Sequence, residues 1–322
     1  MTNIEQIQKI IEAPLEQYNS LVKQALKSQD PYLNQICEYV LSNKGKGLRP
    51  MLSILTAALH GTPDSKVYDA AFLLEIAHTT SLIHDDVVDE SYMRRGQPSL
   101  NALWNGRTAV LVGDYLLTRA LCHCLDNNIS EQVSMVCRAL YHASEGELAQ
   151  SRKVETLNMD RDSYFDIIYK KTAVLFGASA AIGAHSIGAD AKAIADMQAL
   201  GDNIGIAFQI KDDILDYTCD EATTGKPSCC DLREKKITLP LLYTLEQASA
   251  EHKALMLDKL SSIDSHPENI EYLRGEVFKA KGIEYAQKIK EEYCDKAAAM
   301  LSSYEQSQIK TAILLFIDTV RA

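Results

Sequence analysis

Two acidic motifs of the same form constrain this chain more than any other feature. They are Asp85-Asp86-Val87-Val88-Asp89 and Asp212-Asp213-Ile214-Leu215-Asp216, and each lies at the C-terminal side of a strongly apolar helical segment. Residues four apart lie on one face of a helix, so the first and last aspartates of each motif share a face. Like charges placed in this way repel each other, and helix C-termini disfavour anions. The pattern therefore predicts a bound cation at each motif.

The ligand type favours magnesium as that cation. Hard carboxylate oxygens on one helix face, with room for water and phosphate oxygens, are typical of a Mg²⁺ site rather than a closed Ca²⁺ cage. One such cluster alone could be a solvated helix end. Two clusters of identical form, each after a long apolar helical segment, argue against that interpretation.

The rest of the chain predicts helices, because strand and hairpin patterns are short and Gly, Pro, Asn or Asp breaks separate Ala-rich and Leu-rich segments. No break is long or biased enough to be a linker. We therefore expect an all-α bundle of many helices, with residues 1–322 forming one domain. Apolar positions at helical spacing occur in residues 4–28, 66–89, 108–126, 131–153, 162–188, 191–216, 236–248 and 251–263.

Composition excludes some classes of partner. The net charge of −11 argues against a nucleic-acid partner, because such binding needs a basic patch or stripe. It does not argue against anionic ligands, since divalent metals can bridge carboxylates to phosphates.

Cysteine usage and hydropathy predict a cytoplasmic protein. The eight cysteines show no C-x-x-C spacing, so we expect free thiols in a reducing cytosol and no zinc site. The chain opens on a polar, mixed-charge helical pattern rather than a signal peptide. Its longest stretch without Asp, Glu, Lys or Arg, residues 172–189, contains His185 and several small or hydroxyl residues. This stretch indicates a core helix, so no transmembrane segment is expected.

Basic residues accompany the acidic motifs. A turn with the sequence Gly45-Lys46-Gly47-Leu48-Arg49-Pro50 precedes the first motif, and Arg94-Arg95-Gly96 follows it by five residues. Lys171, Lys226 and Lys236 lie near or after the second apolar block. Arginine fits phosphate through its planar fork of donors, and lysine acts as a mobile point charge. Surface ion pairs are the alternative for each of these residues.

Together these motifs resemble those of the trans-type polyprenyl diphosphate synthases, a family that includes farnesyl, geranylgeranyl and octaprenyl diphosphate synthases. In one place the chain departs from the family pattern: Ser228-Cys229-Cys230 stands where the family usually has a glycine and an asparagine. The resemblance covers at least residues 40–245 in order and spacing. It is carried by Gly45–Pro50, His84–Asp89, Arg94-Arg95-Gly96, Gly113-Asp114, Gly146-Glu147, Phe208–Tyr217, Gly225-Lys226-Pro227 and Lys236–Pro240.

The resemblance implies an isoprenoid-synthase fold, in which many helices surround a central cavity, and a magnesium-dependent enzyme in which Mn²⁺ can substitute. Asp85, Asp89 and Asp212 match the metal ligands of the family. Asp86, Asp213 and Asp216 fill the remaining positions of the metal motifs, as partners that act through water or through the ligands. A homodimer is also implied.

The resemblance further assigns the substrates, isopentenyl diphosphate and an allylic diphosphate. His78 lies seven residues before Asp85, hence on nearly the same helical face, although a buried structural histidine is the alternative. Matches to the isopentenyl diphosphate positions are Lys46, Arg49, His78 and Arg95. Matches to the allylic diphosphate positions, which also serve catalysis, are Arg94, Lys171, Gln209, Lys226 and Lys236.

The implied reaction is a dissociative alkylation, in which metal ions stabilise the leaving diphosphate and the double bond of isopentenyl diphosphate attacks the allylic cation. The segment Cys219–Lys236 is a candidate lid. A terpene cyclase would share the fold, but its second metal motif usually has a different form. A metal phosphohydrolase would need further histidines, and an inactive helical partner subunit would not need intact motifs.

Product length is predicted from the residues before the first motif. Short-chain members of the family block this level with bulky aromatic side chains, whereas Ala77, Thr80 and Ser81 are small. We therefore expect a product longer than C20, with C30–C50 favoured and quinone side chains as the use. The alternative is that a neighbouring helix fills the gap, with Met135, Tyr141 or Phe72 as a floor at greater depth. The alternative function is a geranylgeranyl or farnesyl diphosphate synthase.

Overall fold

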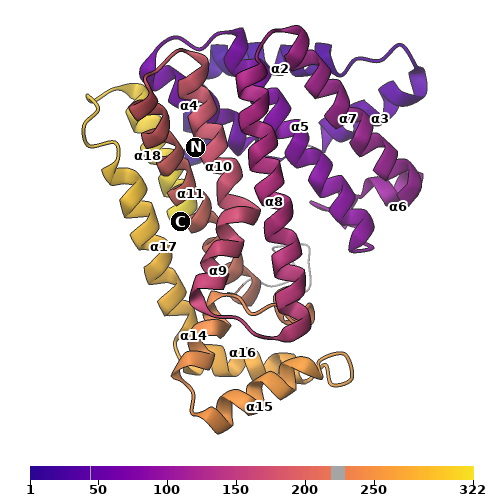
Figure 1. Ribbon diagram of the computed structural model, residues 1–322, viewed down its shortest axis with the longest axis vertical. Helices are drawn as coiled ribbons and strands as arrows, with labels where there is room; N and C mark the ends of the chain where they lie inside the picture. The colour runs from indigo at the N-terminus through magenta and orange to yellow at the C-terminus, as the bar shows by residue number, and fades with distance from the viewer. Residues whose placement is uncertain (44, 219–228) are drawn as a thin grey trace. The chain divides into compact units, whose positions relative to one another are not determined.

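The computed structural model describes residues 1–43, 45–218 and 229–322 and is 79% helical (Figure 1). This confirms the all-α expectation. Within the described ranges, strands occur only as β1 (Met93–Arg94) and β2 (Gln97–Pro98), which pair antiparallel around the Arg95-Gly96 turn. The helices before residue 157 are α1 (Asn3–Ile10), α2 (Glu12–Ala25), α3 (Pro31–Ser42), α4 (Leu48–His60), α5 (Ser65–Val88), α6 (Leu100–Trp104), α7 (Gly106–Asp126) and α8 (Ser130–Thr156).

A continuous helix follows, made of α9 (Arg161–Ile168), the π-helical turn η1 (Tyr169–Ala173) and α10 (Val174–Ser186). A π-turn inside an α-helix frequently marks a functional site, and this one carries Lys171. The later helices are α11 (Ala191–Thr218), α13 (Cys230–Arg233), α14 (Leu239–Gln247), α15 (Ala250–Ser261), α16 (Asn269–Lys279), α17 (Gly282–Ala299) and α18 (Gln308–Arg321).

The backbone divides into two compact units. Helices α8, α10, α11 and α18 contribute residues to both, and the single domain expected from the sequence stays a prediction. Unit 1 comprises Met1–Leu140, Leu175–Gly201 and Ser303–Phe316, and unit 2 comprises Tyr141–Val174, Asp202–Ser302 and Ile317–Ala322.

Local sequence signals explain where several helices begin. Asp64 caps α5 by accepting hydrogen bonds from the backbone N–H groups of Lys66 and Val67, and Asp160 and Ser249 cap α9 and α15 in the same manner. Helix α4 begins after Gly47, whose φ of 64° lies in the left-handed region that glycine tolerates. Pro50 lies within the first turn of α4, where its missing N–H costs no intrahelical bond.

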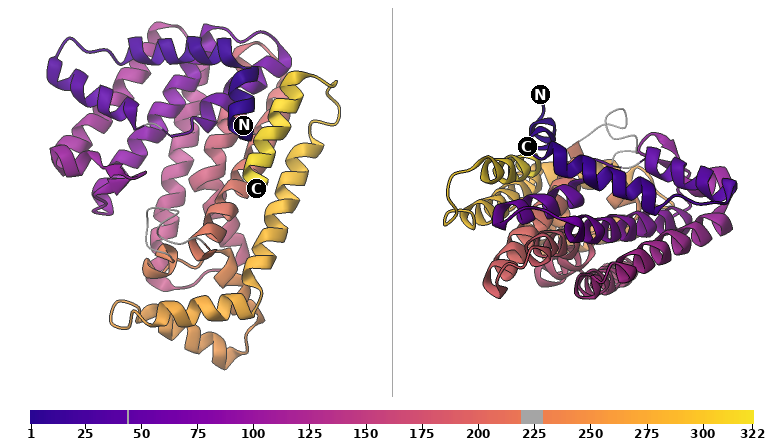
Figure 2. Two further views of the ribbon diagram at one scale, coloured as in Figure 1. Left: turned by 180° about the vertical axis from the view of Figure 1, so that it is seen from behind. Right: turned by 90° about the horizontal axis from the view of Figure 1, so that it is seen from above.

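In unit 1, α5 packs against α4 and lies alongside α7 (Figures 1 and 2). Gly113 leaves room for the imidazole of His84 between α5 and α7, because a Cβ there would collide with that ring. The hydroxyl of Thr80 donates to the Gly113 carbonyl at 3.2 Å and links the two helices again. This packing places the C-terminal end of α5, with the first acidic motif, against a fixed neighbour.

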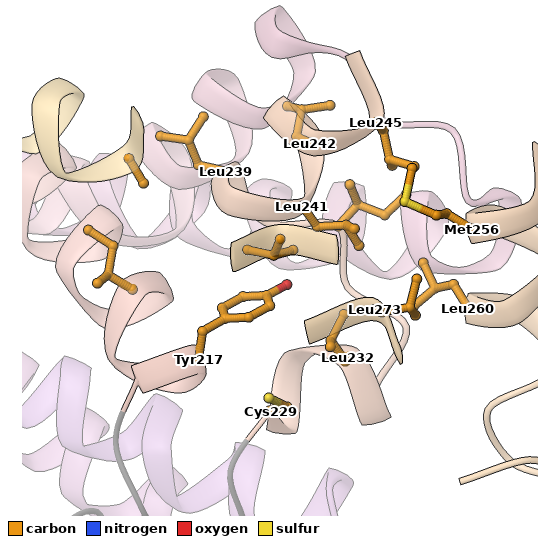
Figure 3. Close-up of a cluster of buried hydrophobic side chains, with 14 of the residues drawn as sticks. Tyr217, Cys229, Leu232, Leu239, Leu241, Leu242, Leu245, Met256, Leu260 and Leu273 are labelled. Carbon is orange, nitrogen blue, oxygen red and sulfur yellow. The ribbon is translucent and has the colours of Figure 1, made fainter. Parts of the chain in front are cut away.

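In unit 2, a cluster of buried apolar side chains surrounds Tyr217 at the C-terminal end of α11 (Figure 3). Leu232 of α13, Leu239 and Leu242 of α14, and Leu273 of α16 pack into the same cluster. The second acidic motif therefore lies on a helix whose end is held by apolar burial.

Within the described part of the chain, two helices are long and apolar enough to cross a membrane by length and composition, α7 and the helix Arg161–Ser186. Buried core helices pass the same test, so this is weak evidence for a span. The apolar window of Arg161–Ser186 is 83% buried inside the protein, in agreement with the expectation of a core helix for residues 172–189.

Candidate active site

The first motif occupies the last turn of α5, where the side chain of Asp86 points into the protein. Asp86 is 3% exposed. Arg94 of β1 donates from Nε to both carboxylate oxygens of Asp86, at 2.7 and 2.9 Å, and its Nη2 lies 2.6 Å from Oδ1. Asp85 is half-buried and Asp89 is exposed. The middle aspartate thus holds the β1–β2 hairpin, and the outer two are the more accessible.

Cationic side chains of unit 1 gather around Arg49 and His78. The Arg49 guanidinium lies 4.6 Å from the centre of the Phe176 ring, and its buried Nε has no hydrogen-bond partner among the described residues. Burial, together with the positive charge of Arg95, lowers the pKa of Arg49 to about 10, although the negative charge of Glu75 opposes this shift. Burial, followed by the charges of Arg49, Arg95 and Arg94, lowers the pKa of His78 well below its ordinary value. Such a crowded group of positive charges favours an anionic ligand.

The turn before α4 contributes to this group. Arg95 donates from Nη1 to the Asn43 carbonyl at 3.1 Å, and its guanidinium packs over Gly45, where a Cβ would lie 2.6 Å from Nη2. Glycine at position 45 therefore admits the arginine. Lys46 is exposed.

The second motif lies in the last turns of α11, and again its middle aspartate is buried. Asp213 is 3% exposed. Its Oδ2 accepts a 2.6 Å hydrogen bond from the hydroxyl of Tyr164, and its Oδ1 accepts a 2.9 Å bond from Nε2 of Gln209. Thr172 donates its hydroxyl to Oε1 of Gln209 at 2.6 Å. Burial raises the pKa of Asp213 to about 7, even though the bonds from Tyr164 and Gln209 oppose the shift.

Asp216 holds the short helix α13. Its Oδ1 accepts from the backbone N–H of Cys230 at 2.9 Å, and its Oδ2 accepts from that of Asp231 at 3.0 Å. The Asp216 carbonyl accepts from the N–H of Cys229, which adopts a positive φ of 57°. The family usually has glycine in this stretch, and glycine tolerates that conformation more readily than cysteine.

Negative charge accumulates around this motif. Burial, then the carboxylates of Asp213 and Asp216, raises the pKa of Asp231 well above its ordinary value. Burial lowers the pKa of Lys236, but Glu234 and Asp231 outweigh it and raise the pKa overall. A cation bound here would relieve the repulsion among these carboxylates.

Lys171 is held in η1 by two polar side chains of α8. Its Nζ lies 2.9 Å from Oε1 of Glu147 and donates to Oε1 of Gln150 at 2.8 Å. Gly146 allows this, because a Cβ there would lie 2.6 Å from the Lys171 backbone nitrogen. One pocket of unit 2 is lined by several of these residues, namely Lys171, Gln209, Asp213, Lys236 and Tyr164.

Sequence reasoning missed Tyr164, Thr172 and Asp231. Thr172 could have been found as the neighbour of Lys171, whereas Tyr164 carries no signal beyond an aromatic residue at helical spacing. Lys226 and most of the candidate lid, residues 219–228, lie outside the described residues.

The residues predicted to set product length are mostly packed. Ala77 and Thr80 are buried, whereas Ser81 is half-buried and donates its hydroxyl to the His78 carbonyl at 2.8 Å. Ser81 is therefore the most accessible of the three.

The donor sets suit a divalent metal that also takes ligands from substrate and water. Among the described residues, no three His, Cys, Asp or Glu side chains form a ready metal cage. Asp86, Asp213 and Asp216 each use both carboxylate oxygens on protein partners. Mg²⁺ is commonly bound through one or two carboxylates together with substrate phosphates, so Asp85, Asp89 and Asp212 fit this ion.

The accessible aspartates at helix ends, together with the clustered cations, indicate a helical enzyme that binds metal ions and diphosphates. Comparison with known proteins gives the family. The polyprenyl synthetase family model matches residues 30–277. The chain is 33% identical over 317 residues to the octaprenyl diphosphate synthase of Haemophilus influenzae, covering 98% of this chain and 95% of that protein. It is 32% identical over 291 residues to the geranylgeranyl diphosphate synthase of Sulfolobus acidocaldarius, covering 88% of each.

A solved structure agrees with these relatives. A polyprenyl synthase from Caulobacter crescentus, in complex with calcium and isoprenyl diphosphate, matches with a TM-score of 0.91 and 30% identity over 99% of this chain and 98% of that one. The chain belongs to the polyprenyl synthetase family, and it is a prenyltransferase of the trans-prenyl diphosphate synthase type. Enzymes of this family depend on divalent metal ions and use isopentenyl and allylic diphosphates.

Proposed function

We propose that this enzyme condenses isopentenyl diphosphate with an allylic diphosphate to make a polyprenyl diphosphate longer than C20. The observation that carries the proposal is shared by both motifs: the middle aspartate is buried on protein partners, whereas Asp85, Asp89 and Asp212 are more accessible. Accessible carboxylates on helix ends, beside clustered cations, suit metal-assisted departure of a diphosphate.

Asp85, Asp89 and Asp212 would hold Mg²⁺, for which Mn²⁺ can substitute. The metal would neutralise the negative charge that develops on the allylic diphosphate as it leaves. Asp86 and Asp213 keep the two helix ends in place, and Asp216 holds α13, so these three act through the structure around the metal.

Two groups of cations would bind the two diphosphates. Lys46, Arg49, His78 and Arg95 would bind isopentenyl diphosphate, and the neutral imidazole expected of His78 would donate a hydrogen bond without adding charge. Arg94, Lys171, Gln209, Lys226 and Lys236 would bind the allylic diphosphate. Fixed orientation of the two substrates would contribute as much as charge, because the double bond must meet the allylic carbon in one geometry.

Product length rests on the small side chains that precede Asp85, above all on the accessible Ser81. Relatives of this chain include an octaprenyl and a geranylgeranyl diphosphate synthase, so their names support both a long and a shorter product. The absence of a bulky aromatic residue at positions 77, 80 and 81 favours the longer one. A geranylgeranyl or farnesyl diphosphate synthase is the alternative.

We further propose a cytoplasmic homodimer that uses α7. This helix exposes Val110, Leu111 and Leu125, which are 39%, 58% and 52% exposed. Apolar side chains exposed along one helix favour burial against a second copy.

The test is incorporation of labelled isopentenyl diphosphate by the purified protein alone, with geranyl or farnesyl diphosphate as primer and chromatography of the products. We expect chain extension beyond C20. Release of diphosphate without extension would indicate a phosphohydrolase or a cyclase, and absence of any reaction would indicate a partner subunit.

A further inference from the structure

Tyr164 is a buried tyrosine close to the second motif, and its hydroxyl is not needed for packing. The residue is 2% exposed and belongs to an apolar cluster that includes Ile168, Ile210 and Ile214. A phenylalanine would fill the same space. Burial of an unpaired hydroxyl costs free energy. The 2.6 Å hydrogen bond to Asp213 offsets this cost.

The bond from Tyr164 begins a chain of hydrogen bonds that ends at Gln209. The carboxylate of Asp213 accepts from Tyr164 on one oxygen and from the Gln209 amide nitrogen on the other. Thr172 donates its hydroxyl to the Gln209 amide oxygen. When Asp213 is ionised, it can only accept from the amide nitrogen, so these contacts set the orientation of the amide and leave its second N–H to donate to a ligand.

The pocket beside Gln209 carries Lys171 and Lys236, each of which lies beside a glutamate. Gln209 lines the same pocket as Lys171 and Lys236, and the lysine ammonium groups carry the positive charge there. An amide N–H presented in such a pocket suits a phosphate oxygen. A rotated amide would present its carbonyl oxygen instead and would repel the same ligand.

We propose that Tyr164 is a positioning residue for the allylic diphosphate: by holding Asp213, it orients the Gln209 amide so that an N–H faces the diphosphate. This rests on the proposed function, in which Gln209 binds that substrate. Tyr164 touches neither substrate nor metal in this role, so its effect passes through Asp213 and Gln209.

The first experiment is Tyr164→Phe, measured for both substrates. We expect the KM for the allylic diphosphate to rise about tenfold, as is typical for the loss of a buried bond to a charged group, while the KM for isopentenyl diphosphate stays unchanged. Tyr285→Phe is the matched control, because its hydroxyl accepts a 2.7 Å bond from Arg161 in the same unit, outside the chain of bonds described above. It should leave both constants unchanged. An unchanged allylic KM in Tyr164→Phe would overturn the proposal.

The second experiment is a double-mutant cycle that separates positioning from general stability. In a Gln209→Ala background, Tyr164→Phe should no longer change the allylic KM, because the group through which it acts is gone. A tenfold rise in the allylic KM in the Gln209→Ala background would show that Tyr164 does not act through Gln209, and it would also reject the proposal. If Tyr164→Phe fails to fold, Thr172→Val tests the same chain of hydrogen bonds from its other end, and the allylic KM is again the measurement.

Turnover by the wild-type enzyme separates a failure of the proposed function from a failure of the positioning role of Tyr164. If the wild-type enzyme does not incorporate isopentenyl diphosphate at all, the proposed function fails. If it does, and the variants change both KM values equally, only the positioning role fails.

Discussion

At the scale of single residues, the aspartates of the two motifs separate by burial. Asp86 and Asp213 are buried and bonded to Arg94 and Tyr164 respectively. Asp89 and Asp212 are exposed. Identical residue types at identical spacing therefore have different roles, because partners from other elements hold Asp86 in the first motif and Asp213 and Asp216 in the second.

The accessible aspartates should be needed for metal-dependent turnover. We expect Asp85→Ala or Asp212→Ala to lower kcat/KM by about 10³-fold or more, equal to several kcal/mol of transition-state stabilisation. Excess chelator should stop the wild-type enzyme, and millimolar Mg²⁺ or Mn²⁺ should restore it. Asp126→Ala, at the exposed end of α7, is the control and should retain full activity. Turnover that continues in chelator would contradict the metal assignment.

Asp202 of α11 should make stability depend on pH. Burial raises its pKa to about 7, and its Oδ1 has no partner among the described residues. A raised carboxyl pKa gives stability that is present below the ordinary value near 4 and is lost as pH rises through about 7. Asp202→Asn should therefore gain stability relative to the wild type between pH 5 and pH 8. Urea denaturation across this range tests it, with Asp126→Asn as the control for loss of charge; a constant difference would refute the burial argument.

At the scale of elements, small residues decide how closely helices approach. Gly113 admits His84 between α5 and α7, Gly146 admits η1 beside α8, and Gly183 admits α4 beside α10. The first contact involves His84, which directly precedes the first acidic motif, and the second involves the backbone nitrogen of Lys171. Helix packing and site geometry are therefore set by the same glycines.

Substituting two helical glycines should give effects of opposite sign. In Gly183→Ala, the added Cβ would collide with the Ser53 carbonyl and the Thr56 hydroxyl, so we expect a loss of roughly 1–3 kcal/mol or more in the free energy of unfolding. In Gly275→Ala on α16, nothing lies within 4 Å of the new Cβ, so we expect a gain of about 0.5–1 kcal/mol. Chemical denaturation measures both. Equal changes in the two variants would mean that helix propensity, not close packing, governs position 183.

The α5 residues before Asp85 should set product length. Ser81→Phe places a bulky ring at the most accessible of the three predicted positions, so we expect shorter products with the first condensation preserved. Ala77→Phe should have the same effect on product length, but Ala77 is buried, so this variant should also lose stability. Product chromatography with isopentenyl diphosphate in excess is the measurement. A wild-type enzyme that stops at C15 or C20 would show that another residue closes the path.

At the scale of the whole molecule, the net charge opposes self-association, whereas the exposed apolar surface favours it. The net charge of −11 favours solubility and weak self-association. The exposed apolar residues of α7 favour association at one place. The proposed dimer through α7 is compatible with both properties, because it buries apolar surface and needs no general attraction between acidic surfaces.

Disruption of this surface should change the oligomeric state. Leu111→Glu places a charge within the proposed contact, and we expect the protein to elute as a monomer in size-exclusion chromatography with light scattering. Leu255→Glu on α15 is the control, since Leu255 is also exposed but lies on another helix. A wild-type monomer, or a Leu111→Glu dimer, would exclude α7 as the interface.

The sequence by itself determined the helical class, the two acidic motifs and the set of candidate cations. These are local properties: the 3.6-residue period and the spacing within one helix follow from backbone geometry and side-chain polarity alone. The predicted helical segments are present, although 4–28 divides into α1 and α2 at Ile11. The split has a local cause, because Pro14 lies in the first turn of α2 and cannot donate to the Ile10 carbonyl at the end of α1. The π-turn at Lys171 has no clear local pattern.

Only the tertiary structure decided which aspartate of each motif is buried and what holds it. Tyr164 and Asp213 are 49 residues apart in the chain, and Asp216 meets the N–H groups of α13 across 14 and 15 residues. No periodicity links such positions, because the hydrogen bonds form only after separate helices have packed. The chemistry of the site could therefore be read from residue types, whereas the roles within each motif depend on neighbours that packing supplies.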